Sequence, residues 1–386
     1  MDRREIVAQL FRDHFGAEPR LWARAPGRVD LMGSHTDYNL GYVLTLPISR
    51  DTWIAARANG SREVRLHAAN LNDSDAFALN RLDEAAPKRW TRYAQGVAFQ
   101  LQAEGLPLAG FDAVIHSTVP LESGLSSSAA LECATAVVFQ ELGGWQMEPK
   151  TMALLCQRAE NEFVGVSCGI LDQYSSCLGQ SECALLLDCR DLSTRAVRLA
   201  DGIGVVVCNT MSPRRLSGGE YAQRRADCEL GASLLGVSAL RDVTPETLAA
   251  RRHELPGHVA KRCEFIVAES RRAESLAQAL EAGDRLAVAQ LCDDSFLGAR
   301  DLYEISAPAM EAMRDAMLAA RGVIGARQAG AGFGGCLVAI VEEAEAGAFA
   351  DAVQQRYWEA TQVCPEIYPV QAAPGANVFA REGRAQ

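Results

Sequence analysis

The chain has 386 residues, of which 48% are hydrophobic and 23% are charged, and its formal net charge at pH 7 is −11. This composition is typical of a globular protein, and the length predicts two domains rather than one core. The acidic balance argues against a nucleic-acid binder, which normally presents a basic stripe. Because the first residues lack the apolar core of a secretory signal and no run of about 18 apolar residues follows, we expect a cytoplasmic protein without membrane contact.

Short apolar runs bounded by Gly, Pro or Asp predict strands, and longer periodic stretches predict helices. In chain order we expect a helix at 2–15, strands at 42–48, 53–57 and 112–119, helices at 126–142 and 150–164, strands at 183–189 and 202–209, helices at 219–235, 258–282, 285–293 and 308–320, a strand at 336–341, a helix at 343–357 and a strand at 366–371. The composition shifts near 195–215. We therefore predict an N-terminal domain at 1–200 and a C-terminal domain at 201–386.

The chain contains twelve cysteines, and their spacing predicts no metal site. Four of them cluster between residues 168 and 189 without forming a C-x-x-C pair, which a structural zinc site would normally contain. We expect reduced thiols, several of which act as small core residues.

The first segment with candidate chemistry is GRVDLMGSHTDYN, residues 27–39. It places an Arg, two Asp, a His and a Ser between two apolar stretches. So many hydrogen-bonding side chains on a short segment favour the lining of a site for a small polar molecule. Structural capping by the aspartates is the alternative.

The second segment is VPLESGLSSSAALE, residues 119–132, which predicts a strand, a Gly-containing loop, a serine run and then a helix. The first N–H groups of a helix lack intrahelical partners and lie at the positive end of its dipole, so they can bind phosphate. The serines add hydroxyls for phosphate oxygens or for a metal ion that bridges them. An ordinary serine N-cap is the alternative reading.

The third segment is RQAGAGFGGCLVAIV, residues 327–341, in which four glycines surround Phe333 and lead into a strand. Glycines permit positive φ angles and close backbone approach. Taken alone, the segment is equally compatible with a tight turn. The order and separation of the three segments together favour a binding site.

These segments resemble the signature motifs of the galactokinase branch of the GHMP small-molecule kinases. The first is similar to that branch's sugar-binding signature, the second to its ATP-phosphate loop and the third to its third motif. Further similar elements are WTRYAQGV (90–97), AENEFVGVSCGILDQYSSCLGQ (159–180) and SGGEYAQRRADCE (217–229). The resemblance extends from about residue 20 to 375. It implies an α+β, two-domain fold with a mixed sheet in the first domain, and an active site in the interdomain cleft.

The resemblance also implies roles for single residues. Asp172 would be the general base for the reacting sugar hydroxyl, and Arg28 would lie beside it and stabilise the transferred phosphoryl group. Ser128 and Glu160 would be the Mg²⁺ ligands, and Gly124, Leu125, Ser126, Ser127 and Ser128 would surround the phosphates of ATP. Trp90 and Tyr93 would lie near the adenine. The sugar would contact Ser34, His35, Asp37, the backbone at Gly169, and Tyr221.

The chain departs from the family pattern within the first segment. Ser34 stands where galactokinases carry a Glu that reaches the sugar's 6-hydroxyl, and Asp30 replaces the usual Asn. A charge-assisted hydrogen bond is worth roughly 1.5–3 kcal/mol, so the loss of that Glu bears on the choice of sugar. L-Arabinose lacks the exocyclic carbon, and galacturonate carries a carboxylate there that Ser34 would tolerate. A bridging water could equally preserve galactose binding.

Two further departures concern the phosphates. Glu122 stands where a Gly is common, and we expect its side chain to point away from the triphosphate. Ala329 replaces a usual Thr or Ser.

The function implied is ATP-dependent phosphorylation of the anomeric hydroxyl of galactose or a galactose-configured sugar. The alternatives are an L-arabinokinase, a galacturonokinase, or a sensor that binds sugar and ATP without turnover. The intact Asp172, Arg28 and serine run argue against the sensor. We expect the sugar and ATP as binding partners and a monomeric state.

Overall fold

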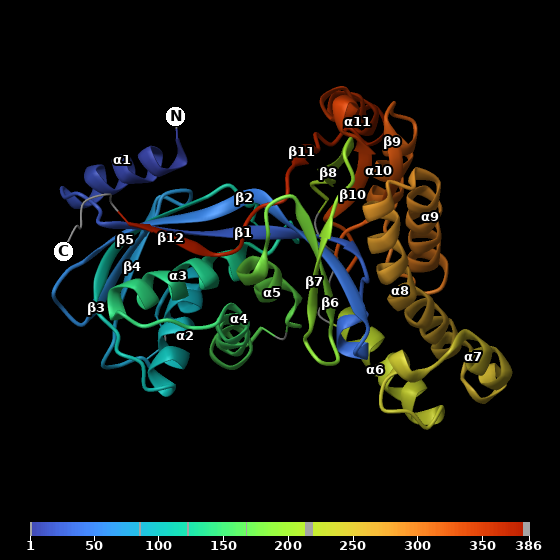
Figure 1. Cartoon of the computed structure of the whole chain (residues 1–386), viewed down its shortest axis with the longest axis horizontal. Helices are drawn as coiled ribbons and strands as arrows, with labels where there is room; N and C mark the ends of the chain where they lie inside the picture. The colour runs from blue at the N-terminus through green and yellow to red at the C-terminus, as the bar shows by residue number, and fades with distance from the viewer. Residues whose placement is uncertain (1, 85, 122, 167, 213–218, 381–386) are drawn as a thin grey trace.

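The computed structural model describes residues 2–84, 86–121, 123–166, 168–212 and 219–380. Two β-sheets lie side by side in it, and helices cover both of them (Figure 1). The first sheet contains β1 (Leu21–Met32), β2 (Tyr42–Ala58), β3 (Glu63–Ala68), β4 (Asp73–Ala78), β5 (Phe111–Ser117), β6 (Cys183–Asp188), β7 (Thr194–Arg198) and β12 (Asn377–Ala380). The strand order is β12-β1-β2-β5-β3-β4, while β6 joins β2 to β7. The sheet is mixed, because β3 and β5 pair in parallel and the other described pairs are antiparallel.

Helices lie on both faces of the first sheet. Successive side chains of a strand point to opposite faces, so Trp53 and Ala55 of β2 pack toward α1 (Arg3–Phe15), whereas Ile54 and Ala56 pack toward the other face. That other face is covered by α2 (Arg89–Ala103), α3 (Ser127–Gly143), α4 (Pro149–Arg158) and α5 (Leu171–Leu178). Double coverage explains why all residues of β1 are buried.

The second sheet has the order β11-β8-β10-β9 and is built from β8 (Ile203–Asn209), β9 (Val323–Gln328), β10 (Cys336–Glu342) and β11 (Glu366–Val370). One face packs on α8 (Gly257–Ala282) and α9 (Arg285–Asp301), and the other on α10 (Pro308–Leu318) and α11 (Ala346–Thr361). The helices α6 (Glu220–Leu234) and α7 (Pro245–Arg251) pack beside the start of α8.

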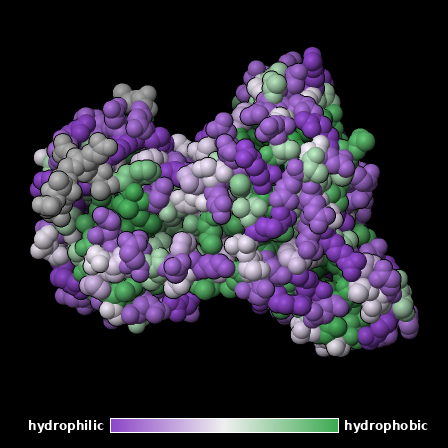
Figure 2. Space-filling view, viewed as in Figure 1, coloured by the Kyte–Doolittle hydropathy of each residue, from purple (hydrophilic) through white to green (hydrophobic). Residues whose placement is uncertain are grey.

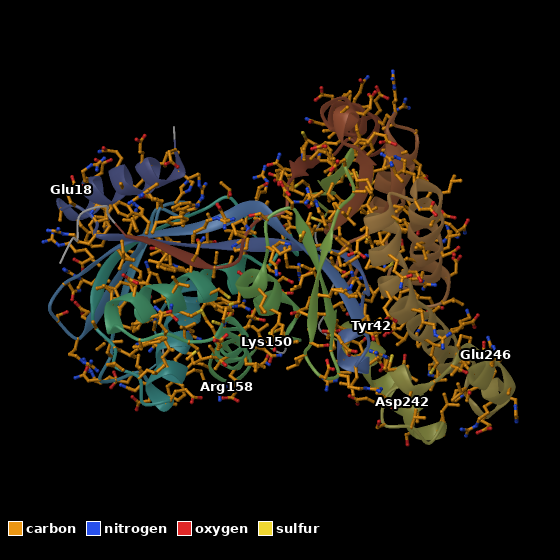
Figure 3. All side chains as sticks on the ribbon, in the orientation of Figure 1. Glu18, Tyr42, Lys150, Arg158, Asp242 and Glu246 are labelled. Carbon is orange, nitrogen blue, oxygen red and sulfur yellow. The ribbon has the colours of Figure 1, made fainter. Side chains whose placement is uncertain are left out.

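The two halves share a core and are joined by polar contacts. Val29 of β1 and Leu44 of β2 belong to the same buried cluster as Val207 and Ile340 of the second sheet. Tyr42, labelled in Figure 3, lies at the end of β2 that faces the C-terminal helices. The guanidinium carbon of Arg241 lies over its ring, 3.8 Å from the ring centroid, which is a cation–π contact. Polar side chains predominate on the outer face shown in Figure 2.

The α+β, two-domain fold class is confirmed by this architecture. The division at residue 200 remains a prediction, and one segment departs from it: β12 returns to the first sheet and pairs with β1 (Figure 1). Such a return cannot be read from local composition. Within the described residues, no helix is long and apolar enough to cross a membrane. The twelve cysteines all lie within the described residues, and none of them forms a disulfide bond there.

Four predicted elements were wrong in detail. The helix expected at 285–293 extends as α9 to Asp301. The strands expected at 42–48 and 53–57 form one strand, β2: β1 pairs with both parts, and the residues between them fall at an irregularity of that pairing, between Pro47 and Asp51. The helix expected at 150–164 ends as α4 at Arg158 and continues as a π-helical segment, Ala159–Val164. Short π segments occur mostly at functional sites.

Candidate active site

The serine loop precedes α3 in a conformation that exposes helix N–H groups. Gly124 has a φ of 82° and Ser126 a φ of 61°, and the left-handed conformation of Ser126, a non-glycine residue, is a strain typical of functional sites. The Ser126 hydroxyl is buried and has no hydrogen-bond partner in the described residues. It does not cap the helix, so the hydroxyl and the first N–H groups of α3 can receive phosphate oxygens.

Strand β1 approaches this loop closely. Arg28 N donates to the Leu125 carbonyl oxygen at 3.1 Å. A Cβ on Gly27 would come within 2.6 Å of the same oxygen, so only glycine permits the contact. The Arg28 guanidinium also donates to the Gly124 carbonyl oxygen at 2.6 Å. Arg28 is therefore held against the phosphate loop.

The other terminal nitrogen of Arg28, Nη2, donates to Asp172 Oδ1. Asp172 lies in the first turn of α5 and is partly exposed, with 24% of its side chain accessible. One side of the guanidinium thus contacts the phosphate loop and the other contacts a carboxylate. This is the arrangement predicted for the catalytic pair, and it is suited to a proton acceptor beside a transferred phosphoryl group.

Two buried carboxylates, Glu160 and Glu132, are hydrogen-bonded to the residue that follows Asp172. Gln173 Nε2 donates to Glu160 Oε2 at 2.7 Å and to Glu132 Oε2 at 3.0 Å. Burial raises the pKa of Glu160, the charge of Asp172 raises it further, and hydrogen bonds from Cys168, Ser128 and Gln173 oppose the shift. Burial and then Glu160 raise the pKa of Glu132 well above its ordinary value.

The predicted Mg²⁺ ligands fit a hard cation. A hydroxyl and a carboxylate are oxygen ligands, and Glu132 Oε1 is buried without a partner among the described residues. No group of three or more His, Cys, Asp or Glu that could hold a metal occurs in the described residues. Mg²⁺ usually binds through one or two carboxylates and the phosphates of its substrate.

The predicted sugar contacts come together near Asp172. Asp37 packs its carboxylate against Gly169, where a Cβ would overlap the carboxylate oxygen. Burial raises the pKa of Asp37 to about 6, and Asp172 and Asp30 add to the shift. The ring of Tyr221 lies 5.2 Å from that of His35 between centroids. These residues thus form one cluster.

His35 is a neutral, fully hydrogen-bonded member of this cluster. Its Nδ1 lies 2.8 Å from the Tyr38 hydroxyl, and its Nε2 lies 3.0 Å from the Ala331 carbonyl oxygen in the glycine-rich third segment. Burial lowers the pKa of His35 to about 4. Both ring nitrogens are engaged, so the imidazole holds the first and third segments together.

Ser34 belongs to a buried ionic network that spans both halves of the molecule. Its hydroxyl donates to Asp30 Oδ2 at 3.0 Å and accepts from Arg327 Nη2 at 2.8 Å. Arg327 also donates to Glu269 Oε1 at 3.1 Å, and Arg272 Nε donates to Glu269 Oε2 at 2.8 Å. Ser34, Asp30, Arg327 and Glu269 are between 0% and 2% exposed. Ser34 is therefore a fixed part of a wall and not a free side chain.

The two residues predicted to lie at the adenine are neighbours on α2, but their contacts differ. Trp90 packs partly against the core, and its Nε1 donates to Asp73 Oδ2 at 3.0 Å. Burial raises the pKa of Tyr93, and the next contribution comes from Glu160. Tyr93 is therefore close enough to Glu160 for the charge of that carboxylate to raise the pKa of the phenol. Their role toward adenine stays a prediction.

Sequence reasoning missed four residues of this region. Glu132 lies four positions after Ser128, which places both on one face of α3, and Gln173 follows Asp172 directly, so local spacing could have indicated both. Glu269 and Arg327 carry no such signal, because their partners are distant in sequence. Glu122, expected to point away from the phosphates, and residues 217–218 of the sixth motif lie outside the described residues. Ala329 is buried, and its N–H donates to the Cys336 carbonyl oxygen at 3.0 Å.

Comparison with known proteins gives the family of this chain. The GHMP kinases N terminal domain matches residues 92–180, the galactokinase galactose-binding signature matches 9–58, and the GHMP kinases C terminal domain matches 276–360. A galactokinase of Roseiflexus sp. is 42% identical over 385 residues, which cover 98% of each chain. One of Chloroflexus aggregans is 42% identical over 377 residues, which cover 96% of each chain.

A solved structure is similar over almost the whole molecule. The crystal structure of Lactococcus lactis galactokinase complexed with galactose matches with a TM-score of 0.91 and 30% identity, and the match covers 97% of this chain and 100% of that one. The resemblance inferred from the motifs is therefore confirmed. The chain belongs to the galactokinase branch of the GHMP kinases, a family of small-molecule kinases.

Proposed function

We propose that this chain transfers the γ-phosphoryl group of ATP to the anomeric hydroxyl of galactose. The observation that carries the proposal is the position of Arg28, which donates to the phosphate loop at Gly124 and to the carboxylate of Asp172. Asp172 lies between that loop and the group formed by Asp37 and Gly169. A sugar hydroxyl and a terminal phosphate would meet there.

The chemistry follows from these residues. Asp172 accepts the proton of the anomeric hydroxyl, the sugar oxygen bonds to the γ-phosphorus, and the bond to the β-phosphate bridging oxygen breaks to release ADP. Arg28 stabilises the negative charge on the transferred group and holds Asp172 in place. The N–H groups at the start of α3 and the hydroxyls of Ser126 and Ser127 bind the phosphates. Mg²⁺, held by Ser128 and Glu160 with the triphosphate, would neutralise part of the phosphate charge.

The sugar contacts proposed are Asp37, His35, Gly169, Tyr221 and the wall that contains Ser34. Asp37 accepts sugar hydroxyls, and Gly169 leaves the space that this carboxylate occupies. Trp90 and Tyr93 are assigned to the adenine end, supported by their common face on α2. We also propose a cytoplasmic monomer, and the twelve free thiols agree with a reducing compartment.

A second candidate is phosphorylation of L-arabinose or galacturonate. It is favoured by the absence of a carboxylate at Ser34 and by the commitment of the Ser34 hydroxyl to Asp30 and Arg327. Ser34 is short and its hydroxyl is already hydrogen-bonded to Asp30 and Arg327. It would therefore bind an exocyclic sugar hydroxyl less strongly than a free carboxylate would.

The test is ATP- and Mg²⁺-dependent formation of sugar 1-phosphate, followed by ³¹P NMR, with galactose, L-arabinose and galacturonate side by side. We expect kcat/KM for galactose to exceed the other two by more than about tenfold, a difference of about 1.4 kcal/mol. A preference for either other sugar would replace galactose as the substrate. Binding of sugar and ATP without turnover of any sugar would indicate the sensor.

A further inference from the structure

The imidazole of His35 connects two segments that lie 296 positions apart in the sequence, and its contacts fix where its proton lies. Nε2 is 3.0 Å from the carbonyl oxygen of Ala331, in the glycine-rich loop at 329–335. A carbonyl oxygen can only accept a hydrogen bond, so Nε2 carries a proton. Burial, and to a smaller extent the charge of Arg224, lower the pKa of the ring to about 4, so the imidazole is neutral at pH 7. Nδ1 is therefore an acceptor without a proton.

Three further groups continue from Nδ1 in a series of hydrogen bonds whose directions follow from that proton. The Tyr38 hydroxyl, 2.8 Å from Nδ1, must be the donor to it. Tyr38 then has no second proton, so the Tyr303 hydroxyl, 2.7 Å away, donates to the oxygen of Tyr38. For the same reason the Cys228 thiol, 3.2 Å from Tyr303, donates to the oxygen of Tyr303. The series thus runs from the thiol to the imidazole in one direction only.

The ring of Tyr221, at the start of α6, packs on this series. Its centroid lies 5.2 Å from that of His35 and 5.7 Å from that of Tyr38. Burial, and then the charges of Asp37 and Asp172, raise the pKa of the Tyr221 hydroxyl, so this ring lies near both carboxylates. The position of Tyr221 relative to the proposed sugar contacts therefore depends on two rings that hydrogen bonds hold in place.

The segment that carries Tyr303 also holds the glycine-rich loop and α6. Phe333 N donates to the Ile305 carbonyl oxygen at 2.7 Å, and a Cβ on Gly332 would come within 2.4 Å of the same oxygen. Arg224 of α6 donates to the Tyr303 carbonyl oxygen at 2.7 Å. His35 on one side and residues 303–305 on the other thus fix the loop between them.

Both ring nitrogens of His35 are consequently in use before any substrate binds. Only 5% of His35 is exposed, and Tyr303 and Cys228 are 0% and 1% exposed. A sugar hydroxyl could bond a ring nitrogen only by breaking a buried hydrogen bond, which would leave Tyr38 or Ala331 without its partner.

We propose that His35 is a positioning residue, which holds Tyr221 and the glycine-rich loop at the sugar site and offers no ring nitrogen to the sugar. The hydroxyls of Tyr38 and Tyr303 keep its proton on Nε2. This inference rests on the proposed function, because the sugar is placed against Tyr221 there, and it deepens that function by separating a residue that holds the site from those that touch the sugar.

The first experiment observes His35 by ¹⁵N NMR in the full-length chain with ring-labelled histidine, and His35→Gln assigns its signals. At pH 7 without ligand, we expect a protonated Nε2 and an unprotonated Nδ1. Saturating galactose should preserve this tautomer and both hydrogen bonds. A proton on Nδ1, a charged ring, or the exchange of either hydrogen bond on addition of galactose would overturn the proposal.

The second experiment removes the hydroxyl in the middle of the series. Tyr303→Phe should raise KM for galactose about 3–10-fold and displace the Nδ1 signal of His35, while kcat and the KM for ATP stay within about twofold. The matched control is Tyr357→Phe, which removes the hydroxyl bond of another fully buried tyrosine to the Thr210 carbonyl oxygen. It should lower the melting temperature by a similar amount without either effect, and equal effects of the two variants would contradict the positioning role.

A graded series completes the test and does not depend on one variant being folded. Displacement of the His35 Nδ1 signal should decrease from Tyr38→Phe to Tyr303→Phe to Cys228→Ala, and Cys228→Ser, which keeps a donor, should preserve the signal. An unchanged signal in Tyr38→Phe would show that no such series exists. Failure of the proposed function is distinguishable, because the unmodified chain would then form no galactose 1-phosphate, whereas the ring signals report on His35 without turnover.

Discussion

The phosphate end and the sugar end of the site are built in different ways. The phosphate end uses β1, the loop before α3, the π segment and α5, all from the first sheet and its helices. The network around Ser34 combines Asp30 and Ser34 with Glu269 of α8 and Arg327 of β9. In the proposed mechanism the reaction chemistry lies within one half, whereas the network around Ser34 depends on how the two halves meet.

Substitutions at the two ends should also affect rate and stability differently. Asp172 is partly exposed and paired once, so changes there should affect rate more than stability. Glu269 is fully buried and paired with two arginines, so changes there should affect stability first. Four measurements test this difference between the two ends, beginning with the one for which we expect the largest effect.

Asp172→Asn should lower kcat by about 10²–10⁴, because the amide keeps the shape and an acceptor for Arg28 but cannot take up the hydroxyl proton. Steady-state kinetics with galactose and ATP measure the loss. The galactose Kd and the melting temperature should change little. A kcat within tenfold of the unmodified chain would contradict the base assignment.

Glu269→Gln should destabilise the fold by about 3–5 kcal/mol, because the fully buried Arg327 and the largely covered Arg272 would both lose the carboxylate with which they pair. Burial opposes ionisation of Glu269, but Arg272 and Arg327 hold its pKa below the usual value. Its contribution is therefore present above the unfolded-state pKa and is lost as the pH falls through the folded one. Urea unfolding measures the change.

The matched control for this change is Glu281→Gln on the same helix. Glu281 pairs with Arg195 at 2.5 Å at the surface, with 35% of its side chain exposed. Its loss should cost less than about 1 kcal/mol. Equal costs at the two positions would show that the buried network does not stabilise the junction between the halves.

Gln173→Met should raise the Mg²⁺ concentration needed for half-maximal rate about 10–100-fold, because Gln173 orients Glu160 and separates it from Glu132. Direct Mn²⁺ binding, followed by electron paramagnetic resonance, gives a readout independent of turnover. Ser175→Ala, on the same helix α5, is the control for helix packing. An unchanged metal affinity would mean that Glu160 is held by other contacts.

Galactose affinity should weaken about tenfold between pH 7 and pH 5, because the pKa of Asp37 is about 6 and only its ionised form is a full acceptor. The folding stability of the sugar-free protein depends on pH in the opposite direction to the affinity. A raised folded pKa contributes stability below the unfolded value, and that stability is lost as the pH rises through about 6. Calorimetric titration from pH 5 to 8 measures the affinity.

Asp37→Asn should flatten this profile. His35 is not the source of the dependence, because its pKa is about 4 and it stays neutral over the whole range. If the profile persists in Asp37→Asn, another carboxylate of the cluster, such as Asp30, titrates instead.

The phosphate end was the more predictable region. The serine loop and its helix were expected at 126–142 and occur as α3 at 127–143, because the signal is local: a Gly, a serine run and good helix formers. By contrast, no strand was predicted over Leu21–Met32, although it forms β1. Its polar residues Arg24, Arg28 and Asp30 disguise a strand that is buried on both faces. Arg24 pairs with Asp51 and Arg28 with Asp172, while Asp30 accepts a hydrogen bond from the Ser34 hydroxyl.

Short motifs in the sequence were enough to indicate the family and the fold class, and to predict the phosphate loop and the catalytic pair, because each motif can be recognised within one short stretch of the chain. The tertiary contacts, by contrast, show that Ser34 is hydrogen-bonded to both Asp30 and Arg327, and that Asp30 Oδ1 is buried without a hydrogen-bond partner among the described residues. They also show that Glu269 and Arg327 belong to the same buried network. Those contacts join residues up to 293 positions apart, and the return of β12 to β1 joins the two ends of the chain. Packing of two separate sheets creates them, and no local pattern encodes it.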